Sequence, residues 1–204
     1  QIGGNGVAMR GHSDTEVLLQ LYLAQRDSED LSKLLLQLNG IFAFALWDED
    51  KQMLLLARDA LGVKPVYYTS GPQGFYFASE IKALKCIAPQ WNETDPIALE
   101  RYLSFLWSPG DKTPVEQVRK LGPGEFIKVK QGQIESHESW YSLPIHMLRK
   151  TEVNAEDAIA LTTAGLRTAV HRQLVSDVPV GAFLSGGLDS SAIVAFAREK
   201  IPQR

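Results

Sequence analysis

The residues with the clearest chemical potential form one short loop near the end of the chain, residues 185–191 (Ser-Gly-Gly-Leu-Asp-Ser-Ser). Free backbone N–H groups and the positive end of a helix dipole attract anions where a loop enters a helix. Two adjacent glycines let the backbone approach a ligand closely, and the serine hydroxyls add hydrogen-bond donors. Asp189 can hold Mg²⁺ against phosphate oxygens. The loop therefore predicts a phosphate-binding site.

Three other interpretations of this loop are weaker. A kinase-type phosphate loop places Lys before the Ser or Thr at the helix start, whereas Asp189 occupies that position here. A hydrolase nucleophile elbow places Gly two residues before its Ser, whereas Phe183 stands there. A turn that only connects two elements would not need four polar residues around its glycines. Phosphate binding is therefore the favoured interpretation.

The segments around the loop are typical of an α/β unit. Residues 178–184 form a short apolar run typical of a buried parallel strand, and the chain from Ser190 onward has helical character. A long helix is predicted at residues 155–174, because apolar residues recur along it at helical spacing. Residues 143–154 have no clear period and contain one proline, so we predict a linker there and a domain boundary near residue 150.

The first 150 residues predict strands and helices without the strand–helix alternation of a parallel sheet. Ser13 and Glu16 form a capping box at the start of a helix predicted at residues 14–26. Three hairpins are predicted from paired strand-like runs: 41–47 with 53–58, 66–69 with 75–78, and 125–130 with 133–138. Further helices are predicted at residues 31–37, 80–87 and 96–107.

Composition limits the class of protein. Hydrophobic residues make up 45% of the 204 residues and charged residues 22%, which excludes disordered and low-complexity classes. The longest apolar run, residues 41–47, is far below the ~18 residues needed to span a bilayer. A net charge of −3 without a basic cluster disfavours nucleic acid as a partner. The single cysteine, Cys86, can form no internal disulfide, which fits a reducing compartment, and we expect a cytoplasmic protein. From the apolar runs and the charge we expect no membrane or nucleic-acid partner.

Several residues outside the loop could be mistaken for chemical groups of a site. None of the four histidines has a partner at metal-ligand spacing; they are His12, His137, His146 and His171. Arg58 and Asp59 end a predicted strand and are interpreted as fixing the turn that follows. Cys86 is interpreted as a buried apolar side chain. We therefore predict no metal site beyond Mg²⁺ at the loop.

Two resemblances to known proteins follow from these residues. The loop at 185–191 resembles the pyrophosphate loop of the N-type ATP pyrophosphatases. Residues 38–45 (LNGIFAFA), 58–68 (RDALGVKPVYY) and 77–84 (FASEIKAL) resemble the glutaminase domain of glutamine-hydrolysing asparagine synthetases, a class-II glutamine amidotransferase domain. The resemblance implies an α+β N-terminal nucleophile hydrolase domain with four αββα layers at residues 1–150. The start of an α/β adenine-nucleotide-binding domain of the ATP pyrophosphatase type is implied at residues 151–204.

The resemblance also implies site residues. Asp14 stands where the family binds the α-amino group of glutamine; the alternative is that Asp14 only stabilises the start of its helix. ATP and pyrophosphate binding is implied for Phe183, Ser185, Gly186, Gly187, Asp189, Ser190 and Ser191, with Asp189 holding Mg²⁺ through phosphate. The family's nucleophile is an amino-terminal cysteine, whereas this chain starts at Gln1. We therefore expect an internal fragment that lacks the glutaminase nucleophile.

The implied activity is that of a glutamine-hydrolysing asparagine synthase, a carbon–nitrogen ligase with glutamine as nitrogen donor. Glutamine, aspartate and ATP are the implied substrates, and Mg²⁺ accompanies ATP. Ammonia from glutamine would attack β-aspartyl-AMP, and AMP and pyrophosphate would leave. Two alternatives stay open: a related ligase that amidates another carboxylate, such as a sugar acid or a β-lactam precursor, and an inactive scaffold. A homodimer stays open as well.

Overall fold

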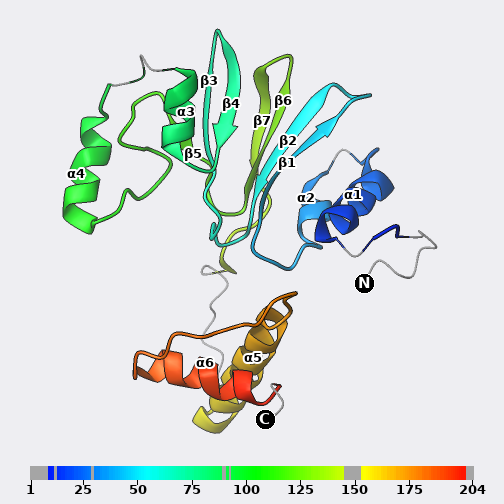
Figure 1. Ribbon diagram of the computed structural model, residues 1–204, viewed down its shortest axis with the longest axis vertical. Helices are drawn as coiled ribbons and strands as arrows, with labels where there is room; N and C mark the ends of the chain where they lie inside the picture. Colours follow the sequence, from blue (N-terminus) through cyan, green and yellow to red (C-terminus); the bar gives the residue numbers. More distant parts are fainter. Residues whose placement is uncertain are drawn as a thin grey trace. The chain divides into compact units, whose positions relative to one another are not determined.

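The computed structural model describes residues 9–11, 13–28, 30–88, 91, 93–144 and 153–200. Contacts between Cα atoms divide the chain into two compact units, Gln1–Leu143 and Pro144–Arg204. Figure 1 draws both, and we describe each by itself. The domain boundary expected near residue 150 falls among residues outside the described ranges. None of the helices in the described ranges has the length and apolar character needed to cross a membrane.

Two antiparallel sheets form the centre of the first unit (Figure 1). The larger sheet has the strand order β1-β2-β6-β7 and consists of β1 (Ala43–Asp48), β2 (Met53–Arg58), β6 (Glu125–Lys130) and β7 (Gln133–Ser139). The smaller sheet has the order β4-β3-β5 and consists of β4 (Gly74–Ala78), β3 (Tyr67–Gly71) and β5 (Arg119–Lys120). The three predicted hairpins are confirmed as β1–β2, β3–β4 and β6–β7. The pairing of β2 with β6 joins two of these hairpins into one sheet.

Side chains on the two faces of β2 belong to different parts of the core. Leu55 packs in a cluster with Tyr22 and Leu35 from the helices on one side of the larger sheet. Its neighbour Leu56 packs with Ile127 and Tyr68, which joins the larger sheet to the smaller one. This division follows from the two-residue period of a strand, which sends successive side chains to opposite faces.

Helices cover the outer faces of both sheets in the first unit (Figure 1). Helices α1 (Asp14–Gln25) and α2 (Ser32–Leu35) lie on the larger sheet, and α3 (Ile81–Ile87) lies on the smaller sheet. The next helix, α4 (Pro96–Phe105), follows α3 in the chain. Leu84 of α3 packs in a third cluster with Tyr67 and Tyr76. The resulting order of helix, sheet, sheet and helix confirms the αββα layers.

The helix starts follow local capping rules. Asp95 accepts hydrogen bonds from the N–H groups of Ile97 and Ala98 at the start of α4. Ser13 accepts one from Thr15 N at the start of α1. The second half of the predicted capping box is wrong, because Glu16 accepts from the N–H groups of Arg10 and Gly11 instead of Ser13. Glu16 thus fixes the segment that leads into α1.

The second unit consists of two helices and the segment between them. These are α5 (Ala155–Gln173) and α6 (Leu188–Arg198). Arg167 of α5 makes an ion pair of 2.8 Å with Glu199 and lies 5.2 Å from the ring centre of Phe196. The strand predicted at residues 178–184 is wrong, since this segment is irregular. A buried parallel strand needs partner strands, and the described part of the second unit contains none.

Candidate functional site

The loop at residues 185–191 adopts a backbone suited to enclosing an anion. Gly186 has a φ of +79°, and a Cβ there would meet no atom within 4 Å, so glycine is required by the backbone and not by packing. Gly187 is the N-cap of α6, and its side-chain-free backbone leaves the first turn of the helix uncapped by any side chain. The N–H groups of this first turn therefore have room for a ligand.

Hydrogen bonds among Ser185, Gly187 and Ser190 stabilise the conformation of the loop. The hydroxyl groups of Ser185 and Ser190 lie 3.0 Å apart, and Ser190 also donates to the carbonyl of Gly187 at 3.1 Å. The N–H of Gly187 donates to Ser185 Oγ at 3.4 Å. The structure thus brings Ser185, Gly187 and Ser190 together, and their binding of phosphate stays a prediction.

Asp189 lies in the first turn of α6 and is exposed. Among the residues that the structure describes, no group donates a hydrogen bond to its carboxylate. Both carboxylate oxygens are consequently available. Mg²⁺ in nucleotide sites is usually held by one or two carboxylates together with substrate phosphates and water. A single free carboxylate beside the predicted phosphate-binding loop fits that donor set.

Phe183 differs from the other predicted members of this site. Its side chain is fully exposed, at 102% of the reference area, and Leu184 just before the loop and Leu188 within it are also largely exposed. An exposed aromatic ring two residues before the first serine is available for stacking. The described residues of the second unit form no wall around it.

Asp14 is the first residue of α1, in the first unit. Its Oδ1 accepts a hydrogen bond of 2.7 Å from Thr15 N, so part of the carboxylate stabilises the helix start. Within the described ranges Oδ2 has no donor, and the side chain is exposed. The geometry supports the helix-start role of Asp14 and leaves one oxygen available for an ammonium group.

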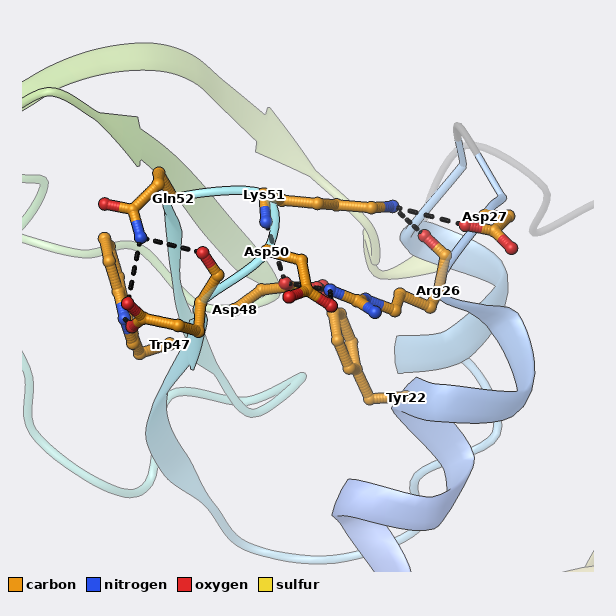
Figure 2. A network of polar contacts seen from close by, with 9 residues as sticks. Tyr22, Arg26, Asp27, Trp47, Asp48, Asp50, Lys51 and Gln52 are labelled. Carbon is orange, nitrogen blue, oxygen red and sulfur yellow. Dashed lines mark hydrogen bonds and ion pairs between the residues drawn. The ribbon is translucent and has the colours of Figure 1, made fainter.

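A network of ion pairs and hydrogen bonds around the buried carboxylate of Asp48, at the other end of α1, was not predicted from the sequence (Figure 2). Asp48 is only 4% exposed and accepts hydrogen bonds from Tyr22 Oη at 2.7 Å and Arg26 Nε at 2.6 Å. Arg26 also pairs with Asp50 at 2.8 Å. Hydrogen bonds from Arg26 hold the pKa of Asp48 well below its ordinary value, while burial and Asp48 raise the pKa of Tyr22 to about 12. The sequence could not predict this network, because hairpin patterns carry no information about long-range partners.

Arg58 and Asp59 have the structural role predicted for them. Arg58 donates to the backbone carbonyls of Gly62, Lys64 and Leu121. The buried carboxylate of Asp59 accepts from three N–H groups in the turn at residues 61–64. Together the two side chains fix the connection that leads from the larger sheet to the smaller one.

The interpretation of Cys86 as a buried side chain is wrong, because the structure places it exposed on α3. Leu84 is the residue by which α3 contacts the core, and position 86 falls on a different face of the helix. His137 pairs with Glu125 at 2.7 Å, and His171 contacts the carbonyl of Phe196 at 3.0 Å. The other two histidines, His12 and His146, lie outside the described residues. In the described part of the chain, no group of three or more His, Cys, Asp or Glu side chains could hold a metal ion.

Comparison with known proteins gives two family matches. Residues 1–141 match the model of the glutamine amidotransferase domain, and residues 162–204 match that of asparagine synthase. The chain is 39% identical over 195 residues to asparagine synthetase [glutamine-hydrolyzing] 3 of Bacillus subtilis, covering 92% of this chain and 30% of that protein. It is 35% identical over 202 residues to asparagine synthetase [glutamine-hydrolyzing] 1 of the same organism, covering 99% and 30%.

A third relative has a different name. Amidase chry2 of Gibberella zeae is 32% identical over 199 residues, covering 95% of this chain and 28% of that protein. The chain therefore spans about 30% of the length of the curated relatives it matches.

Proposed function

The chain belongs to the glutamine amidotransferase domain family through residues 1–141, and on that basis we propose that the whole protein is a glutamine-hydrolysing asparagine synthetase. Glutamine and water would give glutamate and ammonia in the first region. Aspartate and ATP would give β-aspartyl-AMP and pyrophosphate in the second, and ammonia would then displace AMP to form asparagine. The cytoplasm is the proposed location, since a lone cysteine fits a reducing compartment.

In the first region, Asp14 is proposed to bind the α-ammonium group of glutamine. Its Oδ1 is held by Thr15 N at 2.7 Å, which fixes the direction of the carboxylate. Oδ2 then accepts a charge-assisted hydrogen bond from the ammonium group. This contact would select an α-amino acid and orient its side-chain amide toward the nucleophile.

In the second region, the loop at residues 185–191 is proposed to bind the β- and γ-phosphates of ATP, which leave as pyrophosphate. The open backbone at Gly186 admits the phosphates, and the N–H groups at the start of α6 donate to them. Ser185 and Ser190 hold the loop in register and can donate to phosphate oxygens. Mg²⁺ bound to the phosphates would neutralise the charge of the leaving group, and Asp189 would hold it.

The observation that carries the proposal is the order of two matched segments, a glutaminase domain followed by an uncapped glycine loop at the start of α6. One relative, at 32% identity, carries a name other than asparagine synthetase, and a related ligase with another acceptor stays the alternative. A related ligase would use the same loop and the same Asp14, and would differ in the carboxylate that it activates. The open and ordered loop also argues against an inactive scaffold.

The test is the stoichiometry of the full-length protein. With glutamine, aspartate and Mg-ATP, we expect asparagine, glutamate, AMP and pyrophosphate in equal amounts. Asparagine should be identified by chromatography, and AMP should be distinguished from ADP in the same run. Formation of ADP and phosphate would overturn the adenylation chemistry. Pyrophosphate release that requires a carboxylate other than aspartate would favour the second acceptor.

A further inference from the structure

Helix α1 contacts the body of its unit through only a small part of its length. Its buried residues are Leu21 and Tyr22, both in its second half. Val17, Leu19 and Leu23 are more than one-third exposed. Asp14 lies eight residues before Tyr22, which corresponds to about 12 Å along a helix. The position of Asp14 therefore depends on how firmly the far end of α1 is attached.

Leu21 and Tyr22 attach this end of α1 by apolar packing, and the ionic network of Figure 2 adds a second attachment that joins α1 to the hairpin of β1 and β2. Asp48, at the end of β1, accepts from Tyr22, from Arg26 and from the N–H of Lys51 at 3.0 Å. Lys51 in turn donates to the carbonyl of Arg26, and its Nζ lies 3.9 Å from Asp27. Side chain and backbone groups from both elements thus meet around one buried carboxylate.

The segment before α1 is tied to the helix as well. The two carboxylate oxygens of Glu16 accept from the N–H groups of Arg10 and Gly11, at 2.7 and 2.8 Å. Any tilt of α1 would therefore carry this segment and Asp14 with it. A helix is stiff over this length, so a small rotation at its attached end becomes a larger displacement at its free end.

From this geometry we infer that Asp48, together with Arg26 and Tyr22, acts as a positioning residue that places Asp14 for glutamine binding. The inference rests on the proposed function, because it assigns a role in the glutaminase half of that reaction. Asp48 does not touch substrate. It acts through α1, and its loss should weaken glutamine binding more than it slows the chemical step.

The experiment compares three variants of the full-length protein. Asp48→Asn keeps the shape of the side chain and removes the charge that pairs with Arg26. Tyr22→Phe keeps the buried ring and removes only its hydroxyl, so it stays informative if Asp48→Asn fails to fold. Asp95→Asn is the matched control, since Asp95 is also buried, at 3% exposure, and pairs with Lys112 at 2.6 Å, far along the chain from α1.

We expect Asp48→Asn to raise the KM for glutamine about tenfold, with a smaller change in kcat and none in ammonia-dependent synthesis. Tyr22→Phe should raise the same KM about two- to threefold. Asp95→Asn should lower stability comparably and leave the KM unchanged. An equal rise in KM for Asp95→Asn, or an unchanged KM in both Asp48→Asn and Tyr22→Phe, would overturn the inference. A wild-type protein that hydrolyses no glutamine would instead overturn the proposed function itself.

Discussion

The two units differ in how far their residues are packed. In the first unit Leu55, Phe126 and Ile127 are fully buried in the two core clusters on either face of the larger sheet. In the second unit Ala197 is the one residue classed as buried among those described, and Val178 and Phe183 are 69% and 102% exposed. Both units nevertheless have well-formed helices and turns.

This difference separates structure that the local sequence specifies, such as a helix start, from structure that needs contacts with other segments, such as a strand. Helix α6 begins after Gly187 whether or not a sheet lies beside it, since the glycines and the helical spacing are local features. The apolar residues 178–184 form no strand, because a strand exists only through hydrogen bonds to a neighbour. The loop at residues 185–191 therefore depends on local features, whereas a strand at residues 178–184 would depend on partner strands.

The largest expected effect tests whether the two units do separate chemistry. Asp189→Ala in the full-length protein should lower aspartate-dependent exchange of pyrophosphate into ATP at least 100-fold, because the proposed Mg²⁺ ligand is lost. Glutamine hydrolysis should be largely retained. Labelled pyrophosphate measures the first activity, and glutamate release measures the second.

A matched control for this variant is Glu156→Ala, which removes an exposed carboxylate from the first turn of α5 in the same unit. It should leave pyrophosphate exchange unchanged. Equal loss of both activities in Asp189→Ala would contradict the assignment of separate chemistry to the two units.

The next effect concerns the first unit alone. Asp14→Ala should raise the KM for glutamine by an amount equivalent to about 1.5–3 kcal/mol, the range for a hydrogen bond to a charged group. Synthesis from free ammonia should be spared, because that route does not use the glutamine site. A parallel fall with both nitrogen sources would show that Asp14 only stabilises α1.

The sequence predicts most elements of the first unit, and the reasons are visible in particular residues. The hairpin of β6 and β7 follows from Gln131 and Gly132, both with positive φ, between two alternating runs. The pairing of β2 with β6 and the Asp48 network could not be predicted, because they join residues whose spacing carries no periodic signal. At the candidate site, the glycine turn before the last helix is confirmed, although this helix begins at Leu188 and not at Ser190. The binding roles of Phe183 and Asp14 came from the resemblance and stay predictions.

A third prediction compares two glycines of the first unit, Gly124 and Gly132, to separate the effect of backbone strain on stability from the effect of close packing. Gly124 has a φ of +65°, and a Cβ there would lie 2.6 Å from the backbone oxygen of Tyr141. Gly132 has a φ of +73°, and its nearest contact would be 3.6 Å away. Gly124→Ala should lower the free energy of unfolding by about 2–3 kcal/mol, and Gly132→Ala by about 1 kcal/mol.

Denaturant unfolding followed by tryptophan fluorescence measures this difference. The four tryptophans of residues 1–204, which are Trp47, Trp91, Trp107 and Trp140, belong to the first unit, so the fluorescence of a protein limited to these residues reports that unit. Equal losses for the two variants would mean that the close approach of Gly124 to Tyr141 is relieved by a local shift.

The smallest effect is a pH dependence confined to the first unit. His137 and Glu125 form a pair of 2.7 Å between β7 and β6, and Glu125 also accepts from the N–H of Gly122. The hydrogen bond with Glu125 raises the pKa of His137 above its ordinary value of 6.5, and the same bond lowers the pKa of Glu125. A histidine whose pKa is raised by folding adds stability that is complete below about pH 6.5 and is lost as the pH rises through the folded-state pKa.

We therefore expect the tryptophan-monitored free energy of unfolding to contain a contribution from His137 that fades above about pH 6.5. Both side chains are about one-third exposed, so solvent screening should limit it to less than about 1 kcal/mol. His137→Gln should remove this part of the pH dependence. His171→Gln is the control in the second unit, where His171 contacts Phe196 and Glu199. If His171→Gln changed the pH dependence of the tryptophan-monitored free energy of unfolding as much as His137→Gln does, the two units would unfold as one. The difference in packing between the two units would then not appear as a difference in their stability.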